Sequence, residues 1–347
     1  MGQFLASPPL NRLRGRSSRM APFPVHPFNS LVFELNCSVL SMMSYLFVGK
    51  WLPLLIGVVE TSDASSLNRL NLLQALILGV VQGLTEFLPI SSTAHVKIVP
   101  VLLGWGDPGV AFTAIIQLGS IAAILSYFWA DLRELMLNMA EAASESRFDS
   151  ADFRVGLGIL IGTLPIVFFG GLIKLFLPNF DQSPLRSSAA IAIASIVMGI
   201  FLGISEILGK RKRGFDGLGL FDGIGMGAAQ ALALIPGVSR AGSTLTAGLF
   251  MGLDRATAAR FSFLMGIPAI TLAGLVELKG FLDAQANYIG LIPMIGGLVS
   301  ALISSYIVIV WLLRFLKNHS TWVFVWYRLG FGASILFAIA ANVLQNV

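Results

Sequence analysis

Residues 72–88 read LLQALILGVVQGLTEFL, and Pro89 follows them. The stretch is apolar enough for a membrane helix, but it is shorter than the roughly 20 residues that cross a bilayer. Because proline cannot continue a helix, we expect the helix to end before Pro89. A polar run, 91–95 (SSTAH), and a short apolar piece, 96–104, come next. The pattern predicts a helical hairpin that enters the membrane and returns without crossing it.

The second half of the chain repeats this plan. Residues 218–235 read LGLFDGIGMGAAQALALI and lead to Pro236, and Gln230 precedes this proline as Gln82 precedes Pro89. A Gly-rich polar turn, 237–244 (GVSRAGST), and a short piece, 245–252, complete the second hairpin. Interrupted short segments at matching places in two halves are typical of an inverted repeat with its site near the midplane. Long apolar segments follow each hairpin, at about 110–130, 155–177 and 187–209, and at 261–281, 289–313 and 322–345.

The composition indicates a membrane protein. Of the 347 residues, 56% are hydrophobic and 12% are charged, whereas a soluble domain carries about 25% charge. These values exclude a soluble enzyme, a disordered protein and a nucleic-acid partner, and the continuous apolar stretches exclude a β-barrel. We predict an all-α, polytopic helical membrane protein with an inverted-topology repeat, built from two opposed re-entrant hairpins and six transmembrane spans.

The chain divides into an N-terminal extension and a membrane domain. Residues 1–70 form an N-terminal extension that is rich in proline and arginine, and we expect it to be poorly ordered. Its apolar stretch 39–59 is either an anchor helix or a signal-like segment, and translation from Met42 or Met43 is an alternative. The single cysteine, Cys37, excludes an intramolecular disulfide. Residues 71–347 form the membrane domain, with one repeat at 71–213 and the other at 214–347.

Basic residues set the expected orientation, since cytoplasmic loops carry an excess of lysine and arginine. If each long segment crosses once, all three basic groups lie on the cytoplasmic side. The first hairpin then enters from outside and the second from the cytoplasm, so their tips meet inside the bilayer. The groups are Arg133, Arg147 and Arg154; Lys210 to Arg213 with Arg255 and Arg260; and Arg314 with Lys317.

The first tip carries groups suited to proton transfer. Gln82 and Glu86 are four residues apart and share one face of a helix. An ionisable residue in an apolar helix is costly and usually lines a cavity, although pairing with a basic neighbour for packing alone is an alternative. The hydroxyl groups that follow can cap a helix, but capping does not explain the imidazole of His95 at membrane depth.

The second tip carries an arginine in a Gly-rich turn. Arg240 at the start of a helix is suited to clamp a phosphate or a carboxylate, and its alternative role is that of a counter-ion for Glu86. Together the tips suit an anionic phosphate group. They are compatible with phosphoanhydride hydrolysis or with transport of a phosphorylated lipid.

Two motifs resemble those of the undecaprenyl-diphosphatase family, the bacitracin-resistance type of membrane phosphatase. One is residues 82–95 (QGLTEFLPISSTAH), and the other is residues 236–244 (PGVSRAGST). The resemblance covers about residues 70–347. This chain departs from the family pattern at two positions. Gln82 stands where glutamate is the alternative residue, and Ala241 stands where many members carry serine.

The resemblance implies an enzyme that removes the terminal phosphate of undecaprenyl diphosphate and so recycles the lipid carrier for cell-wall synthesis. A polyprenyl-phosphate carrier or flippase is the alternative function. The resemblance also implies a multi-pass protein of the bacterial inner membrane with a site open to the periplasm. It further implies a homodimer and help from a divalent cation, Mg²⁺ or Ca²⁺, with Glu86 as the best candidate ligand and no organic cofactor.

By the same resemblance, Arg240 holds the diphosphate, while Glu86 and His95 transfer protons or activate the nucleophile. That nucleophile is Ser92 or water. The substrate-binding residues predicted around them are Gln82, Ser91, Thr93, Ser239, Ser243 and Thr244.

Overall fold

The structure is a computed structural model that describes residues 70–106, 108–177, 180, 183–283 and 290–346. Within these ranges it contains eleven α-helices and no β-strand, which confirms the predicted all-α class. The predicted extension 1–70 lies outside the described residues except for Leu70, and so do its segment 39–59 and Cys37.

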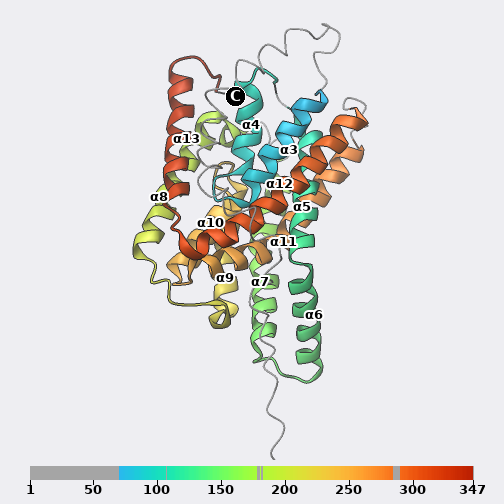
Figure 1. The fold of residues 1–347 in the computed structure, drawn as a ribbon, viewed down its shortest axis with the longest axis vertical. Coiled ribbons are helices and arrows are strands. Elements are labelled where there is room, and N and C mark those ends of the chain that lie inside the picture. Colours follow the sequence, from blue (N-terminus) through green and yellow to red (C-terminus); the bar gives the residue numbers. More distant parts are fainter. Residues whose placement is uncertain (1–69, 107, 178–179, 181–182, 284–289, 347) are drawn as a thin grey trace, which may run out of the picture.

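The helices fall into two series of similar order. The first hairpin consists of α3 and α4, and the second of α9 and α10 (Figure 1). The helices are α3 (Leu72–Phe87), α4 (Ser92–Leu102), α5 (Gly109–Tyr127), α6 (Trp129–Ser144), α7 (Ala151–Phe176), α8 (Ser188–Leu208), α9 (Leu220–Ala231), α10 (Arg240–Phe250), α11 (Arg255–Asp283), α12 (Leu291–Asn318) and α13 (Trp322–Ala340), with 3₁₀ turns η4 (Pro184–Arg186), η5 (Phe215–Gly217) and η6 (Leu232–Leu234).

In the described part of the chain, five helices are long and apolar enough to cross a membrane, namely α7, α8, α11, α12 and α13. A sixth span is obtained if α5 and α6, which meet at an angle of 64°, are counted as one. The bend lies at Phe128, where the apolar segment predicted at 110–130 gives way to the charged sequence of α6. The length and composition of these helices make the chain a multi-pass helical membrane protein, with five to six candidate spans in the described part.

The helix α3 begins and ends where local chemistry requires. Asn71 and Gln74 form a reciprocal capping box with hydrogen bonds of 2.9 and 3.0 Å. At the other end, Leu88 has an extended backbone, as expected of a residue that precedes proline. The predicted end of this helix before Pro89 is therefore confirmed.

Glycines bring the first helix of each hairpin against a helix of the other half. On α3, a Cβ atom at Gly83 would lie 2.6 Å from the backbone nitrogen of Ser305 in α12. On α9, a Cβ atom at Gly227 would lie 2.3 Å from the Cα atom of Gly162 in α7. Such close approach between membrane helices needs residues without a side chain. The two halves are thus interlocked, and α8 and α13 also pack against each other.

The helix α6 and the lower part of α7 lie side by side and extend beyond the rest of the bundle in Figure 1. By contrast, the two hairpins lie among the other helices. Both short helices that follow a hairpin turn, α4 and α10, have 11 residues. This arrangement places the start of α4 and the start of α10 inside the bundle.

Candidate active site

The carboxylate of Glu86 lies at the centre of a small polar group. Its Oε2 atom accepts hydrogen bonds from Ser92 Oγ at 2.7 Å and from Gln82 Nε2 at 3.1 Å. The bond to Gln82 spans one turn of α3, and the bond to Ser92 crosses the hairpin turn to the first residue of α4. A hydroxyl group hydrogen-bonded to a carboxylate has the geometry of a nucleophile beside its base.

Arg240 meets this group from the second hairpin. Its Nη2 atom lies 3.6 Å from Oε1 of Glu86, and the two side chains are only 8% and 11% exposed. At 3.6 Å the contact is an ion pair but not a hydrogen bond. Nη1 makes a long bond of 3.4 Å to the carbonyl oxygen of Ser262, and Nε and Nη2 have no hydrogen-bond partner in the described part of the chain. Arg240 therefore keeps N–H groups that can donate hydrogen bonds to an anion.

The other hydroxyl groups of the second tip bond within their own hairpin or to α11, where the hydroxyl group of Ser262 lies 2.5 Å from that of Thr244. Ser239 Oγ accepts a hydrogen bond of 3.1 Å from the backbone nitrogen of Gly242 and so caps α10. Ser243 and Thr244 donate to the carbonyl oxygen of Arg240 at 3.0 and 2.8 Å. These three predicted substrate-binding residues are close to Arg240 in the chain, but their hydroxyl groups shape the turn that carries it and, at Thr244, also join α10 to α11.

The predicted residues of the first tip separate into two groups. Ser92 contacts Glu86, whereas Thr93 is exposed and Ser91 and His95 are buried. The ring of His95 uses both of its nitrogens, Nδ1 with the carbonyl oxygen of Ser91 at 2.7 Å and Nε2 with the hydroxyl group of Tyr327 at 2.7 Å. Since a carbonyl oxygen only accepts, Nδ1 carries a proton and donates it to this bond. His95 thus contacts α13, and no bond joins it to Glu86 among the contacts of the described residues.

Strain marks the residue before each tip helix. Ser91 and Ser239 have φ angles of 78° and 72°, in a region that residues with a Cβ atom seldom adopt. Ser91 precedes Ser92, and Ser239 precedes Arg240, so the two strained positions aim the two residues that meet Glu86. Strained residues of this kind cluster at functional sites.

Arg328 is a site residue that the sequence analysis missed. Its side chain is 1% exposed and donates only to carbonyl oxygens. From α13 it bonds to Pro89 at 2.9 Å, to Gly237 at 2.7 Å and to Val238 at 3.1 Å, and also to Ser195 of α8 at 3.0 Å. One guanidinium group therefore fastens both hairpin turns. An arginine inside the apolar segment 322–345 is costly in a membrane, and that cost was the signal that could have identified it.

The donor set does not form a metal cage made of protein alone. In the described ranges, no three histidine, cysteine, aspartate or glutamate side chains are grouped so that they could hold a metal ion. Glu86 is the carboxylate nearest to Arg240 in the contacts above. A Mg²⁺ ion is often held by one or two carboxylates together with phosphate oxygens of the substrate, and Glu86 fits that pattern.

Taken together, fold and site define a multi-pass helical membrane protein with a buried arginine beside a carboxylate that accepts a hydrogen bond from a hydroxyl group. The chain belongs to the family of the Bacitracin resistance protein BacA, whose family model matches residues 75–334. This confirms the resemblance noted in the sequence.

Three relatives share most of its length, and each is named an undecaprenyl-diphosphatase. The protein of Nostoc sp. is 62% identical over 285 residues, which are 82% of this chain and 89% of the relative. The protein of Trichormus variabilis is 63% identical over 286 residues, with coverage of 82% and 89%. The protein of Synechococcus elongatus is 62% identical over 283 residues, with coverage of 82% and 98%.

Proposed function

We propose that this protein hydrolyses undecaprenyl diphosphate to undecaprenyl phosphate and inorganic phosphate, and thereby recycles the lipid carrier for cell-wall synthesis. Membership of the BacA family and relatives named undecaprenyl-diphosphatase support this activity. The observation that carries it is the hydrogen bond from Ser92 to Glu86 beside Arg240, whose guanidinium group has unused donors.

In this proposal, Ser92 is the nucleophile and Glu86 is its base. Ser92 Oγ forms a bond to the terminal phosphorus while its proton passes to Glu86 Oε2, which lies 2.7 Å away. The bond from phosphorus to the bridging oxygen breaks, and undecaprenyl phosphate leaves. Water then hydrolyses the phosphoserine and releases inorganic phosphate. Arg240 binds the phosphoryl oxygens and stabilises their charge in both steps.

His95 and a divalent cation have secondary places in this scheme. His95 acts through the carbonyl oxygen of Ser91, which it holds at the strained turn before Ser92. Proton transfer by His95 itself stays a prediction. Glu86 would hold Mg²⁺ or Ca²⁺ jointly with diphosphate oxygens, and a bound cation would neutralise part of the phosphate charge.

We also propose that the two halves form an inverted repeat whose hairpins are re-entrant. The glycine contacts of α3 with α12 and of α9 with α7 support this, since each hairpin helix packs on the other half. The helices α3 and α9 can be aligned on Gly83 and Gly227, the glycines that contact the other half. In this alignment Gln230 corresponds to Glu86, because each lies three residues after its glycine, whereas the sequence pattern matched Gln230 with Gln82.

The proposed orientation places the basic loops in the cytoplasm and opens the catalytic site to the periplasm of a bacterial inner membrane. In its support, Arg211 and Arg255 of the second basic group line one cavity with Lys317 of the third. Arg260 forms an ion pair of 2.8 Å with Asp131 of α6, which lies two residues from Arg133 of the first group. A membrane domain over 71–347 and a homodimer are retained as predictions of the family resemblance.

The experiment that tests this function follows the phosphoryl group. Purified protein receives undecaprenyl diphosphate labelled in its terminal phosphate, and acid quenching traps any covalent label. We expect labelled wild-type protein, no label on Ser92→Ala, and a rate for that variant lower by about a hundredfold or more. Ser334→Ala is the control, because Ser334 is an exposed serine of α13 bonded within its own helix. Wild-type phosphate release by Ser92→Ala would exclude Ser92 as the nucleophile, and no release by the wild type would exclude the activity.

A further inference from the structure

A second polar centre lies where the C-terminal end of α8, the start of α11 and the end of α12 meet. It surrounds a cavity of about 300 Å³, which is within the size range of small-ligand sites. No lining residue belongs to α3, α4 or α10, the helices that carry the candidate active site. The lining residues with charged side chains are Arg211, Asp254, Arg255, Arg260 and Lys317.

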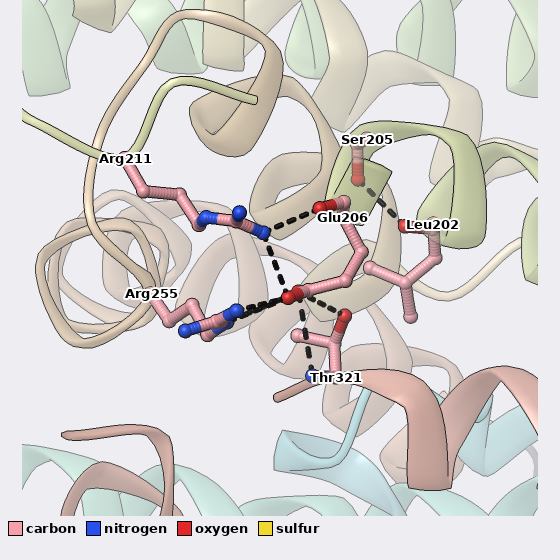
Figure 2. A network of polar contacts seen from close by, with 6 residues as sticks. All are labelled: Leu202, Ser205, Glu206, Arg211, Arg255 and Thr321. Carbon is pink, nitrogen blue, oxygen red and sulfur yellow. Dashed lines mark hydrogen bonds and ion pairs between the residues drawn. The ribbon is translucent and has the colours of Figure 1, made fainter. Parts of the chain in front are cut away.

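One wall of the cavity is held by the carboxylate of Glu206, which is 3% exposed. Figure 2 shows Arg211, Arg255 and Thr321 converging on it. Arg211 Nη1 lies 2.9 Å from Oε1, Thr321 Oγ1 donates to Oε2 at 2.7 Å, and Arg255 contacts both oxygens through Nε at 2.9 and 3.1 Å. Two guanidinium groups thus share one carboxylate. The wall is rigid, and it carries one positive charge in excess.

The opposite charges around the cavity are already engaged by the protein. Asp254 accepts from the backbone nitrogen of Thr257 at 2.8 Å and from its hydroxyl group at 2.9 Å, so both oxygens cap α11. Asp131 pairs with Arg260, whose guanidinium group also lies 4.8 Å from the ring centre of Phe215. The charged groups in and around the cavity are therefore four cations and three carboxylates. The cations are Arg211, Arg255, Arg260 and Lys317, and the carboxylates are Asp131, Glu206 and Asp254.

The start of α11 also faces the cavity, and its cap Asp254 offsets part of the positive charge of this helix end. Arg255, Ala256 and Thr257 open this helix of 29 residues and line the cavity. A helix N-terminus carries a partial charge of about +0.5 and directs backbone N–H groups outward. A rigid cavity with excess positive charge, guanidinium groups and a helix N-terminus is the arrangement that phosphate groups favour.

We propose that this cavity is an anion site that binds a phosphate group, either as free phosphate or as the headgroup of an anionic phospholipid. It is separate from the catalytic centre along α11. Arg240 packs on Gly266 of this helix, and at 1.5 Å per residue Arg260 and Arg255 lie about 9 and 16 Å from that point. Of the basic run at 210–213, Arg211 therefore lines a binding site in addition to its part in the orientation signal. Arg213 does not line the cavity, and it is paired with Asp222 at 2.7 Å.

Native mass spectrometry of the full-length protein in detergent tests this site with two probes. One arm adds inorganic phosphate, and the other adds phosphatidylglycerol against phosphatidylcholine with the same acyl chains. The variant Arg211→Gln/Lys317→Gln removes two charges from the lining. Its matched control, Lys210→Gln/Lys212→Gln, removes two exposed charges of the same region that do not line the cavity. Thermal midpoints in detergent show whether both variants are folded.

We expect the cavity variant to bind at least about tenfold more weakly than the control, since two positively charged donors are lost from the lining. Selective loss of phosphatidylglycerol identifies a lipid headgroup as the ligand, and loss of inorganic phosphate identifies the free ion. Equal binding by the two double variants would overturn the proposal, because the anion would then occupy another site. Absence of anion binding by the wild type in both arms would overturn it as well.

Discussion

Arg328 Nη1 donates a hydrogen bond of 2.9 Å to the carbonyl oxygen of Pro89. The bond joins the last described helix, α13, to the turn of the first hairpin. The same guanidinium group bonds to Gly237 and Val238 of the second turn. Because Glu86 and Ser92 flank the first turn and Arg240 follows the second, Arg328 links the two turns that carry the proposed catalytic groups.

Replacing Arg328 should therefore affect both stability and rate. We expect Arg328→Met to lose about 3 kcal/mol of stability, since several buried carbonyl groups lose their donor. Arg328→Lys should be folded yet slow, because an ammonium group cannot serve all four carbonyl groups in the same geometry. Detergent thermal midpoints and phosphate release measure the two effects. Arg147→Met, at an arginine whose side chain is 53% exposed, is the control.

Glu86→Gln keeps the size of the side chain but removes its negative charge and its ability to accept a proton. We expect the rate of phosphate release to fall by roughly a hundredfold or more, as is typical when a positioned base is lost. The family resemblance predicts that Gln82→Glu is tolerated, because glutamate is the alternative residue at this position of the motif. Turnover close to the wild-type rate by Glu86→Gln would show that Glu86 serves packing alone.

Arg240→Lys separates a phosphate clamp from a counter-ion. The positive charge beside Glu86 is kept, so we expect a folded protein. Most activity should be lost, because lysine cannot hold two phosphate oxygens in a planar fork. Arg240→Ala should be unstable as well as inactive, since Glu86 would be left unpaired in a buried site. If Arg240→Lys proved both stable and fully active, Arg240 would be a counter-ion only.

The glycine contacts predict that small substitutions disrupt the packing of both hairpins. A Cβ atom at Gly83 would lie 2.6 Å from the backbone of α12, and one at Gly227 would lie 2.3 Å from that of α7. We expect Gly83→Ala and Gly227→Ala each to lower stability by about 1–3 kcal/mol, the usual cost of overpacking. Gly171→Ala is the matched control in a helix, because nothing lies within 4 Å of its Cβ position. Thermal midpoints equal to that control would contradict the interlocked arrangement.

The orientation is tested with single cysteines in a Cys37→Ser background. Asp149→Cys lies between α6 and α7, and Gln345→Cys lies after α13; both positions are exposed. We expect a membrane-impermeant maleimide, added to intact cells, to label Gln345→Cys and to leave Asp149→Cys unlabelled until the cells are opened. Labelling of Asp149→Cys in intact cells would reverse the proposed orientation.

Much of the fold was predictable because hydropathy and proline act locally. The apolar segments near 155–177, 187–209 and 322–345 correspond to α7, α8 and α13 within a few residues. The bend at Phe128 was not predicted. The sequence changes there from apolar to charged, but this change does not determine the angle between α5 and α6. Of the site, Glu86, Ser92 and Arg240 were predicted from their motifs, and the structure brings these three together.

The sequence by itself determined that this chain is a helical membrane protein, because burial in lipid requires apolar helices. It also located both tips, because a polar run follows Pro89 and Pro236 and interrupts the apolar pattern there. Only the tertiary structure decided which groups meet. Tyr327 reaches His95 across 232 residues of sequence, and Arg328 reaches Pro89 across 239. Such partners depend on how the helices of the two halves interlock. No local sequence pattern specifies a contact between residues so far apart in the chain. The same reason explains how basic loops far apart in the chain come to line one cavity.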